Sequence, residues 1–106
     1  MEAKAALEAM RALVKRCSNR QLSEVVNGLN KLRADPAQAE LVRLPLAVAM
    51  AEHSRRIEEW LVSRFESVPA GAWVKPYEVA ADLAREFGGS PGGYAVAVGE
   101  FLSRAA

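Results

Sequence analysis

The sequence contains no threonine, one cysteine and one histidine among its 106 residues. Cys17 cannot form an internal disulfide and has no CxxC partner, so neither a disulfide framework nor a zinc site is expected. The apolar stretch of residues 44–51 is far shorter than the roughly 20 apolar residues that cross a bilayer. Residues 1–10 lack the basic start and apolar core of a signal peptide. We therefore expect a soluble cytoplasmic protein without cofactors.

Charge is distributed unevenly along the chain. The composition, 51% hydrophobic and 25% charged with a net charge of +1, is that of a globular protein. Residues 1–34 hold seven bases and three acids, a net charge of +4, whereas residues 35–106 hold seven bases and ten acids, a net charge of −3. A polyanion would therefore bind at the N-terminal third. Ten arginines against four lysines, with five amide side chains, suggest a thermophile or a GC-rich genome.

The first 44 residues carry consecutive helix signals. Apolar residues recur at spacings of three and four over residues 3–17, which predicts an amphipathic helix. Ser18 and Gln21 have the spacing of a capping box and predict the start of a second helix. The side chains that this helix is expected to bury are Leu22, Val25, Val26, Leu29 and Leu32. Asp35-Pro36 then predicts a short helix that ends near Arg43.

Pro45 predicts a kink or a restart before the longest helix of the chain. The apolar stripe of that helix is Leu46, Ala49, Met50, His53, Ile57, Trp60, Leu61 and Phe65. Pro69 and Gly71 predict a turn that is followed by a brief extended stretch over residues 72–74.

Two further helices are predicted beyond this turn. Pro76 begins the first of them, which ends at Gly88-Gly89 because glycine allows left-handed backbone angles. The side chains that this helix is expected to bury are Tyr77, Ala80, Leu83 and Phe87. Ser90-Pro91 begins the last helix, whose apolar positions include Tyr94, Val98, Phe101 and Leu102.

These elements predict an all-α fold, a compact bundle of five to six helices with a C-terminal helix-turn-helix-like unit and at most one very short strand. We expect a single domain over residues 1–106. Within it, residues 1–44 form a basic helical part, and residues 45–106 form the long helix and the helix-turn-helix-like unit.

Residues that could carry catalysis are few. His53 lies on the predicted apolar stripe between Met50 and Ile57, where a packed histidine is the more common finding. Cys17 lies on the predicted buried face of the first helix, where a cysteine behaves as a small hydrophobe. The glycine-rich run over residues 88–93 has no lysine and lacks the order of a phosphate-binding loop. We do not expect an enzyme, although an active site assembled across an oligomer is an alternative.

The C-terminal third resembles a known family. The segments that carry the likeness are Val68-Pro69-Ala70-Gly71, Val74, Tyr77-Glu78-Val79-Ala80, Ser90-Pro91-Gly92 and Ala97-Val98-Gly99. In this order they resemble the winged-helix DNA-binding half of the alkylguanine-DNA alkyltransferases and their alkyltransferase-like relatives. The resemblance implies a helix that enters the minor groove of DNA. The active-site Pro-Cys-His-Arg of that family has no counterpart in this sequence, and Val96 stands at the position of its intercalating arginine, so alkyl transfer is not expected.

The layout of the whole chain is similar to that of a second group. Two amphipathic N-terminal helices, a bend at Leu44-Pro45 and the long segment LPLAVAMAEHSRRIEEWLVSRF look similar to the ThermoDBP-related single-stranded-DNA-binding proteins of hyperthermophilic archaea. This likeness of order and length implies binding of single-stranded nucleic acid.

Basic residues gather where the first two predicted helices meet. Lys15, Arg16 and Arg20 lie at this junction, with Arg11 one turn earlier. Cations beside exposed aromatic rings suit a single strand, whose bases stack while its backbone follows the positive charge. The residues that we predict to bind nucleic acid are Arg11, Lys15, Arg16, Arg20, Lys31, Arg33, Trp73, Lys75 and Tyr94.

The sequence therefore predicts a non-enzymatic nucleic-acid-binding protein that favours single-stranded or structured nucleic acid over sequence-specific duplex DNA. The alternative is a helical protein–protein interaction module or a subunit of an oligomer, because the stripes of residues 1–17 and 46–65 are long enough to contact a partner helix as well as the core. A homodimer is compatible with both functions.

Overall fold

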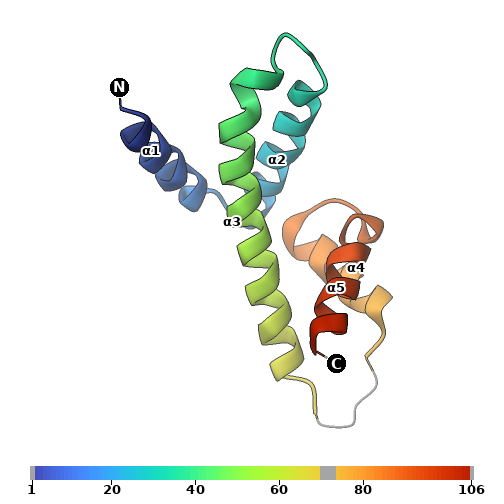
Figure 1. Ribbon diagram of the computed structural model, residues 1–106. Coiled ribbons are helices and arrows are strands. Elements are labelled where there is room, and N and C mark those ends of the chain that lie inside the picture. Colours follow the sequence, from blue (N-terminus) through green and yellow to red (C-terminus); the bar gives the residue numbers. More distant parts are fainter. Residues whose placement is uncertain (1, 70–73, 106) are drawn as a thin grey trace. The chain divides into compact units, whose positions relative to one another are not determined.

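The computed structural model describes residues 2–69 and 74–105, and helices make up most of both ranges (Figure 1). In chain order the helices are α1 (Ala3–Arg16), α2 (Asn19–Arg33), α3 (Ala39–Glu66), α4 (Pro76–Phe87), the short 3-10 helix η1 (Pro91–Tyr94) and α5 (Ala95–Ala105). The described residues contain no β-strand, which confirms the all-α prediction. Most of the extended stretch predicted over residues 72–74 lies outside the described ranges.

The chain divides within α3 into two compact units, an N-terminal unit (Met1–Ser54) and a C-terminal unit (Arg55–Ala106). The prediction of a single domain over residues 1–106 stays a prediction. None of the helices in the described part has both the length and the hydrophobicity of a membrane span.

The N-terminal unit contains the predicted capping box, which joins α1 to α2. The Ser18 N–H donates to Gln21 Oε1 at 2.8 Å, and the Gln21 N–H donates to Ser18 Oγ at 3.1 Å. These bonds satisfy two amide groups that a helix start otherwise leaves without a partner in the helix. Because Cys17 caps the end of α1 and Ser18 caps the start of α2, the connection between the helices is short and well defined.

The core of the N-terminal unit is small. Its buried apolar cluster consists of Leu22, Val26, Leu46 and Ala49, with Val14, Cys17 and Leu29 packed against it half-buried. No residue of α1 is buried. The burial predicted for Val25, Leu32 and Met50 is wrong, because all three are exposed. Apolar spacing marks a wide arc on each helix, and the helices of this unit cover only part of that arc.

The start of α3 also differs from the prediction. The Asp35 carboxylate accepts from the Ala37 N–H at 3.0 Å, and the Asp35 carbonyl oxygen accepts from the Gln38 and Ala39 N–H groups, both at 2.9 Å. Asp35 therefore stabilises a turn, and the helix begins three residues after Pro36.

α3 continues through Pro45 to Glu66 without interruption, so the separate short helix and the restart predicted near Arg43 are wrong. Pro45 lies in the second turn, where it removes one helical hydrogen bond. Leu46 and Ala49 are buried just beyond it. Tertiary packing of this kind supplies most of the stability of helices in proteins, and it offsets the local cost of the proline.

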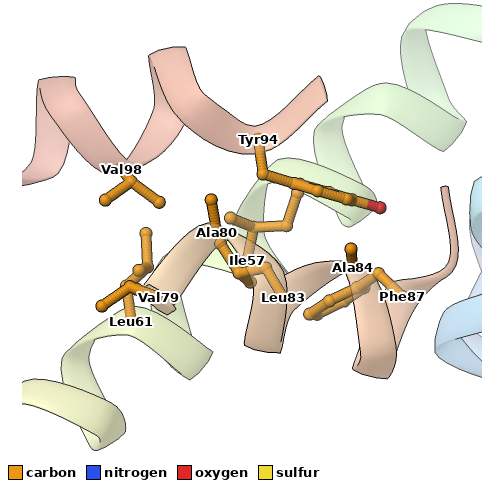
Figure 2. Close-up of a cluster of buried hydrophobic side chains, with 9 residues drawn as sticks. All are labelled: Ile57, Leu61, Val79, Ala80, Leu83, Ala84, Phe87, Tyr94 and Val98. Atoms are coloured by element: carbon orange, nitrogen blue, oxygen red, sulfur yellow. The ribbon is translucent and has the colours of Figure 1, made fainter. Parts of the chain in front are cut away.

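The C-terminal unit has a larger core, which Figure 2 shows in close-up. Its nine buried side chains are Ile57, Leu61, Val79, Ala80, Leu83, Ala84, Phe87, Tyr94 and Val98. They come from α3, α4, η1 and α5, and they point toward one another (Figure 2). The burial predicted for Tyr77 is wrong, because its side chain is 74% exposed. Val79 is fully buried instead.

Both ends of α4 lie where the sequence predicts them. Pro76 occupies the first turn, and the Gly88 N–H donates to the Ala84 carbonyl oxygen at 2.8 Å. Gly88 and Gly89 have φ angles of 86° and 90°, a region that L side chains rarely adopt. The helix predicted from Pro91 begins as η1, and its α-helical part starts at Ala95.

Polar and aromatic contacts also connect the helices of the C-terminal unit. The largely buried Asp82 carboxylate contacts Arg64 of α3 at 2.6 Å and also contacts Arg85 of α4. The rings of Phe65 in α3 and Phe101 in α5 stack with their centroids 5.4 Å apart. α3, α4 and α5 are therefore held together by more than apolar burial.

Candidate nucleic-acid interface

The most pronounced charge feature of the structure is an acid-free segment, residues 9–23, which lies between Glu8 and Glu24. It spans the last turns of α1 and the first turn of α2, so the capping box at Ser18 fixes its middle. Its four cations are Arg11, Lys15, Arg16 and Arg20, and all four are exposed. A phosphate chain that passes over this segment would meet positive charge without a competing carboxylate from the segment itself.

The cations of this segment occupy two flanks of α1. Arg11 and Lys15 are four residues apart and therefore share one face of the helix. Arg16 lies about 100° further round the helix axis, where it borders a shallow groove between α1 and α2. A ligand that contacts all of these cations must curve around the end of α1, which a flexible single strand does more easily than a rigid duplex.

The groove beside Arg16 is a feature that the sequence did not predict. Its lining residues are Leu13, Arg16, Cys17, Gln21, Glu24 and Val25. Apolar spacing placed Val25 in the core, whereas its side chain is 38% exposed and faces this groove. The available signal was the position of Val25 beside Val26, because adjacent residues on a helix point about 100° apart and a narrow core buries only one of them.

Lys31 and Arg33 lie away from the junction, in the last turn of α2. Lys31 follows Arg20 by 11 residues, which corresponds to roughly 16 Å along the helix axis. Cations in a last helical turn offset the negative end of the helix dipole. These two exposed residues therefore have a structural role of their own, and they would extend the interface only for a ligand that follows α2.

Three residues predicted to bind nucleic acid, Trp73, Lys75 and Tyr94, belong to the C-terminal unit. Trp73 lies outside the described residues, and Lys75 is an exposed residue at the N-cap of α4. The prediction that Tyr94 offers a stacking surface is wrong, because this side chain is 7% exposed. Its hydroxyl donates to the Gly88 carbonyl oxygen at 2.5 Å, and its ring packs against Phe87. The glycine-rich turn folds this residue back onto α4, so its ring is part of the core.

α5 is the helix that the alkyltransferase resemblance places in a DNA groove. Val96, at the position of the family's arginine, is 70% exposed. The two charged residues of α5 are Glu100 and Arg104, and the Arg104 guanidinium lies 3.5 Å from the Glu58 carboxylate. α5 therefore presents an apolar side chain where the resemblance implies a cation, and its own arginine is next to an acid.

The two residues considered for catalysis, Cys17 and His53, are both half-buried, and they belong to different helices. Cys17 Sγ lies 3.7 Å from the Leu13 carbonyl oxygen, one turn earlier, and His53 lies on α3. Over residues 2–69 and 74–105, no group of three His, Cys, Asp or Glu side chains is placed to hold a metal ion.

Comparison with known proteins adds no family: no protein-family model, curated protein or solved structure matches this chain. A function for this chain must therefore be argued from its own residues and contacts.

Proposed function

We propose that the protein binds single-stranded or structured nucleic acid through the cations at the α1–α2 junction. The observation that carries the proposal is the acid-free segment 9–23, with four exposed cations around a connection that the capping box holds in place. Each phosphate that such a cation neutralises releases condensed counterions, which drives association. The residues proposed to contact phosphate at this junction are Arg11, Lys15, Arg16 and Arg20.

The burial of Tyr94 changes the expected mode of binding. Without this ring, contacts to the phosphate backbone dominate, and such contacts carry no sequence information directly. We therefore expect a low base preference and a steep loss of affinity with salt. Trp73 remains a candidate for stacking, and Lys31, Arg33 and Lys75 remain candidates for further phosphate contacts.

A triple charge reversal at the junction tests the proposal. We expect Lys15→Glu, Arg16→Glu and Arg20→Glu together to weaken binding to a labelled single strand by at least about thirtyfold at low salt, because three cations become repulsive. Fluorescence anisotropy against single-stranded DNA, single-stranded RNA and duplex DNA of equal length, each at two salt concentrations, measures the loss and identifies the preferred form.

The matched control reverses the same number of charges elsewhere. Arg43, Arg55 and Arg104 each lie beside a carboxylate, of Glu40, Glu59 and Glu58 respectively. The triple variant Arg43→Glu, Arg55→Glu and Arg104→Glu should bind the labelled strand with an affinity within about threefold of the wild type. A carboxylate beside each of these arginines already offsets its attraction for a phosphate. An equal loss in both variants would show that only net charge matters. A wild-type protein that binds no nucleic acid at low salt would also contradict the proposal.

Exposed apolar surface favours a protein-interaction module as the second candidate. The exposed large apolar side chains of the N-terminal unit are Leu13, Val25, Leu32, Leu41, Leu44 and Met50. Leu13 and Val25 line the same groove, and exposed apolar side chains that lie together mark interaction sites more often than isolated ones do. This function would not depend on the cations of segment 9–23, so the charge-reversal triple would leave it intact.

A further inference from the structure

The groove between α1 and α2 combines apolar and polar side chains beside the junction cations. Its apolar lining comes from Leu13, Cys17 and Val25, and its polar lining comes from Arg16, Gln21 and Glu24. Leu13 is 63% exposed and Val25 is 38% exposed. Because Leu13 belongs to α1 and Val25 to α2, a ring placed in this groove would contact both helices.

The two charged side chains of the groove have opposite signs and come from different helices. Arg16 ends α1, two residues before Ser18. Glu24 follows Ser18 by six residues, which corresponds to roughly 9 Å along the axis of α2. It is also the acid at which the acid-free segment 9–23 ends. A phosphate is therefore attracted to Arg16 and repelled by Glu24, so the groove favours a ligand with negative charge at one end and N–H donors at the other.

We propose that this groove binds one unpaired base of the nucleic-acid strand, and that the base is guanine. A phosphate of the strand contacts Arg16, and the base ring lies against Leu13 and Val25. The N–H groups of the base donate to the Glu24 carboxylate. The inference rests on the proposed nucleic-acid binding, and it adds a preference at one nucleotide to the low base preference that phosphate contacts give.

The acceptor character of Glu24 selects among the bases. An ionised carboxylate has two oxygens that accept hydrogen bonds and no group that donates one. Guanine presents two adjacent donors, N1–H and the N2 amino group, which suit the two oxygens. Cytosine and adenine present one amino group beside a ring nitrogen that is itself an acceptor. Thymine and uracil present one N–H between two carbonyl oxygens, which the carboxylate repels.

Gln21 supplies a donor that complements Glu24. Its Oε1 accepts from the Ser18 N–H at 2.8 Å, so the amide offers a ligand its N–H groups. Gln21 and Glu24 are three residues apart and therefore lie on one face of α2. Guanine carries its O6 acceptor next to N1–H on the same edge, an order that matches Gln21 followed by Glu24. The capping box consequently orients a groove residue as well as the start of the helix.

The same contacts exclude a base that is already paired. In a duplex the N1–H and N2 amino groups of guanine donate to cytosine, so they are not offered to the Glu24 carboxylate. Unpaired bases present this edge to proteins. The attraction of the junction cations for phosphate is present for both forms of nucleic acid. The groove therefore supplies a reason for the preference for a single strand that the cations alone do not supply.

Fluorescence anisotropy against four labelled single strands tests the base preference. Each strand has about 12 nucleotides. One contains thymine throughout, and the others carry guanine, cytosine or adenine at every third position. The wild type should bind the guanine strand at least about fivefold more tightly than the thymine strand. Equal affinities for all four strands would overturn the inference and leave the proposed function standing, whereas the proposed function fails when no strand binds at low salt.

Glu24→Gln tests the carboxylate as the group that selects guanine. This variant should reduce the preference for the guanine strand to within about twofold. It should also raise the affinity for the thymine strand, because one charge that repels phosphate is gone. The matched control Glu8→Gln removes the exposed acid at the other end of segment 9–23, outside the groove lining. The control should tighten binding of every strand alike and keep the preference, and an equal loss of preference in both variants contradicts the proposal.

Leu13→Ser tests the apolar contact with the base. It should weaken binding of the guanine strand by at least about fivefold, because the ring loses apolar surface to cover. The control Leu41→Ser changes a side chain that is 72% exposed in the same unit and lies outside the groove lining, and it should bind as the wild type does. Equal losses in the two variants would show that the effect does not come from the groove.

Cys17 reports on occupation of the groove independently of affinity. It is the single cysteine of the chain, and it lines the groove half-buried. A base that lies against Leu13 covers its sulfur, so the guanine strand at saturation should slow alkylation by iodoacetamide at least about fivefold more than the thymine strand does. A rate that the saturating guanine strand leaves unchanged would overturn the placement of the base in this groove, whatever the affinities.

Discussion

The two units of this chain are built from the same kind of amphipathic helix and reach different degrees of burial. Among the described residues, the C-terminal unit has nine buried apolar side chains in one cluster, whereas the N-terminal unit has six, of which four form its core cluster. Nine large apolar side chains are exposed among the described residues, and six of them belong to the N-terminal unit. The C-terminal unit therefore covers more of its hydrophobic surface than the N-terminal unit does, and the N-terminal unit leaves more of it for another molecule.

Charge follows the same division. In the C-terminal unit, Arg55, Arg64, Arg85 and Arg104 each contact a carboxylate. In the N-terminal unit, segment 9–23 has four cations and no acid of its own. Two of these pairs, Arg64–Asp82 and Arg104–Glu58, connect different helices of the C-terminal unit, whereas the Arg43–Glu40 pair of the N-terminal unit lies within α3. The binding function that we propose belongs to the N-terminal unit because segment 9–23 lies there.

The difference in core size between the two units is tested most strongly by removing one large side chain from each core. Phe87→Ala should lower the free energy of unfolding by about 4 kcal/mol, because its neighbours enclose the space that the ring leaves. Leu22→Ala should cost about 2 kcal/mol, since the smaller core around it can relax or admit water. Both residues are almost completely buried in the protein. Urea unfolding followed by circular dichroism measures the two costs, and a larger cost for Leu22 would show that core size does not separate the units.

The ion pairs offer a second, smaller test. Asp82→Asn removes the carboxylate that contacts both Arg64 and Arg85, and it should destabilise the protein by about 1–2 kcal/mol because the group is largely buried. Glu59→Gln removes the exposed partner of Arg55 and should cost less than about 0.5 kcal/mol. Thermal unfolding of the two variants in low and high salt distinguishes a buried ion pair from an exposed one. If the Asp82 effect disappeared in high salt, this carboxylate would behave as a surface charge, and the units would differ less than we infer.

The sequence predicted those helix boundaries that residues within one turn of the boundary determine. The capping box at Ser18, the proline at Pro76 and the left-handed Gly88 act within one turn of the chain, so neighbouring residues suffice to recognise them. The continuation of α3 through Pro45 could not be predicted in this way. It depends on the burial of Leu46, which involves residues distant in sequence.

Which side of a helix faces the core was also beyond the local pattern. Tyr77 and Val79 both fit the apolar spacing of α4, but only Val79 is buried. The same reasoning applies to the candidate site, because the sequence placed the junction cations together but did not show that α1 separates them onto two flanks. Tyr94 belongs to the core because the turn at Gly88 brings its hydroxyl to a backbone carbonyl, a contact that spacing does not reveal.

The smallest expected effects decide whether the two units are separate in solution. Gly28 in α2 and Gly99 in α5 are exposed, and a Cβ added to either meets no atom within 4 Å. Gly28→Ala and Gly99→Ala should each stabilise the protein by about 0.5–1 kcal/mol, because alanine loses less backbone entropy in a helix. If the chain unfolds as the single domain that its sequence predicts, both substitutions raise the same melting temperature.

If the units unfold separately, each alanine shifts only the transition of its own unit. Differential scanning calorimetry resolves the two cases, and hydrogen exchange of amides in α2 and α5 assigns the transitions. Because the N-terminal unit has the smaller core, its transition should come first. A nucleic acid bound at the α1–α2 junction would then raise that transition selectively, since a ligand stabilises the state that binds it. A ligand that shifted only the transition of residues 55–106 would place the binding site in the other unit and reverse the comparison.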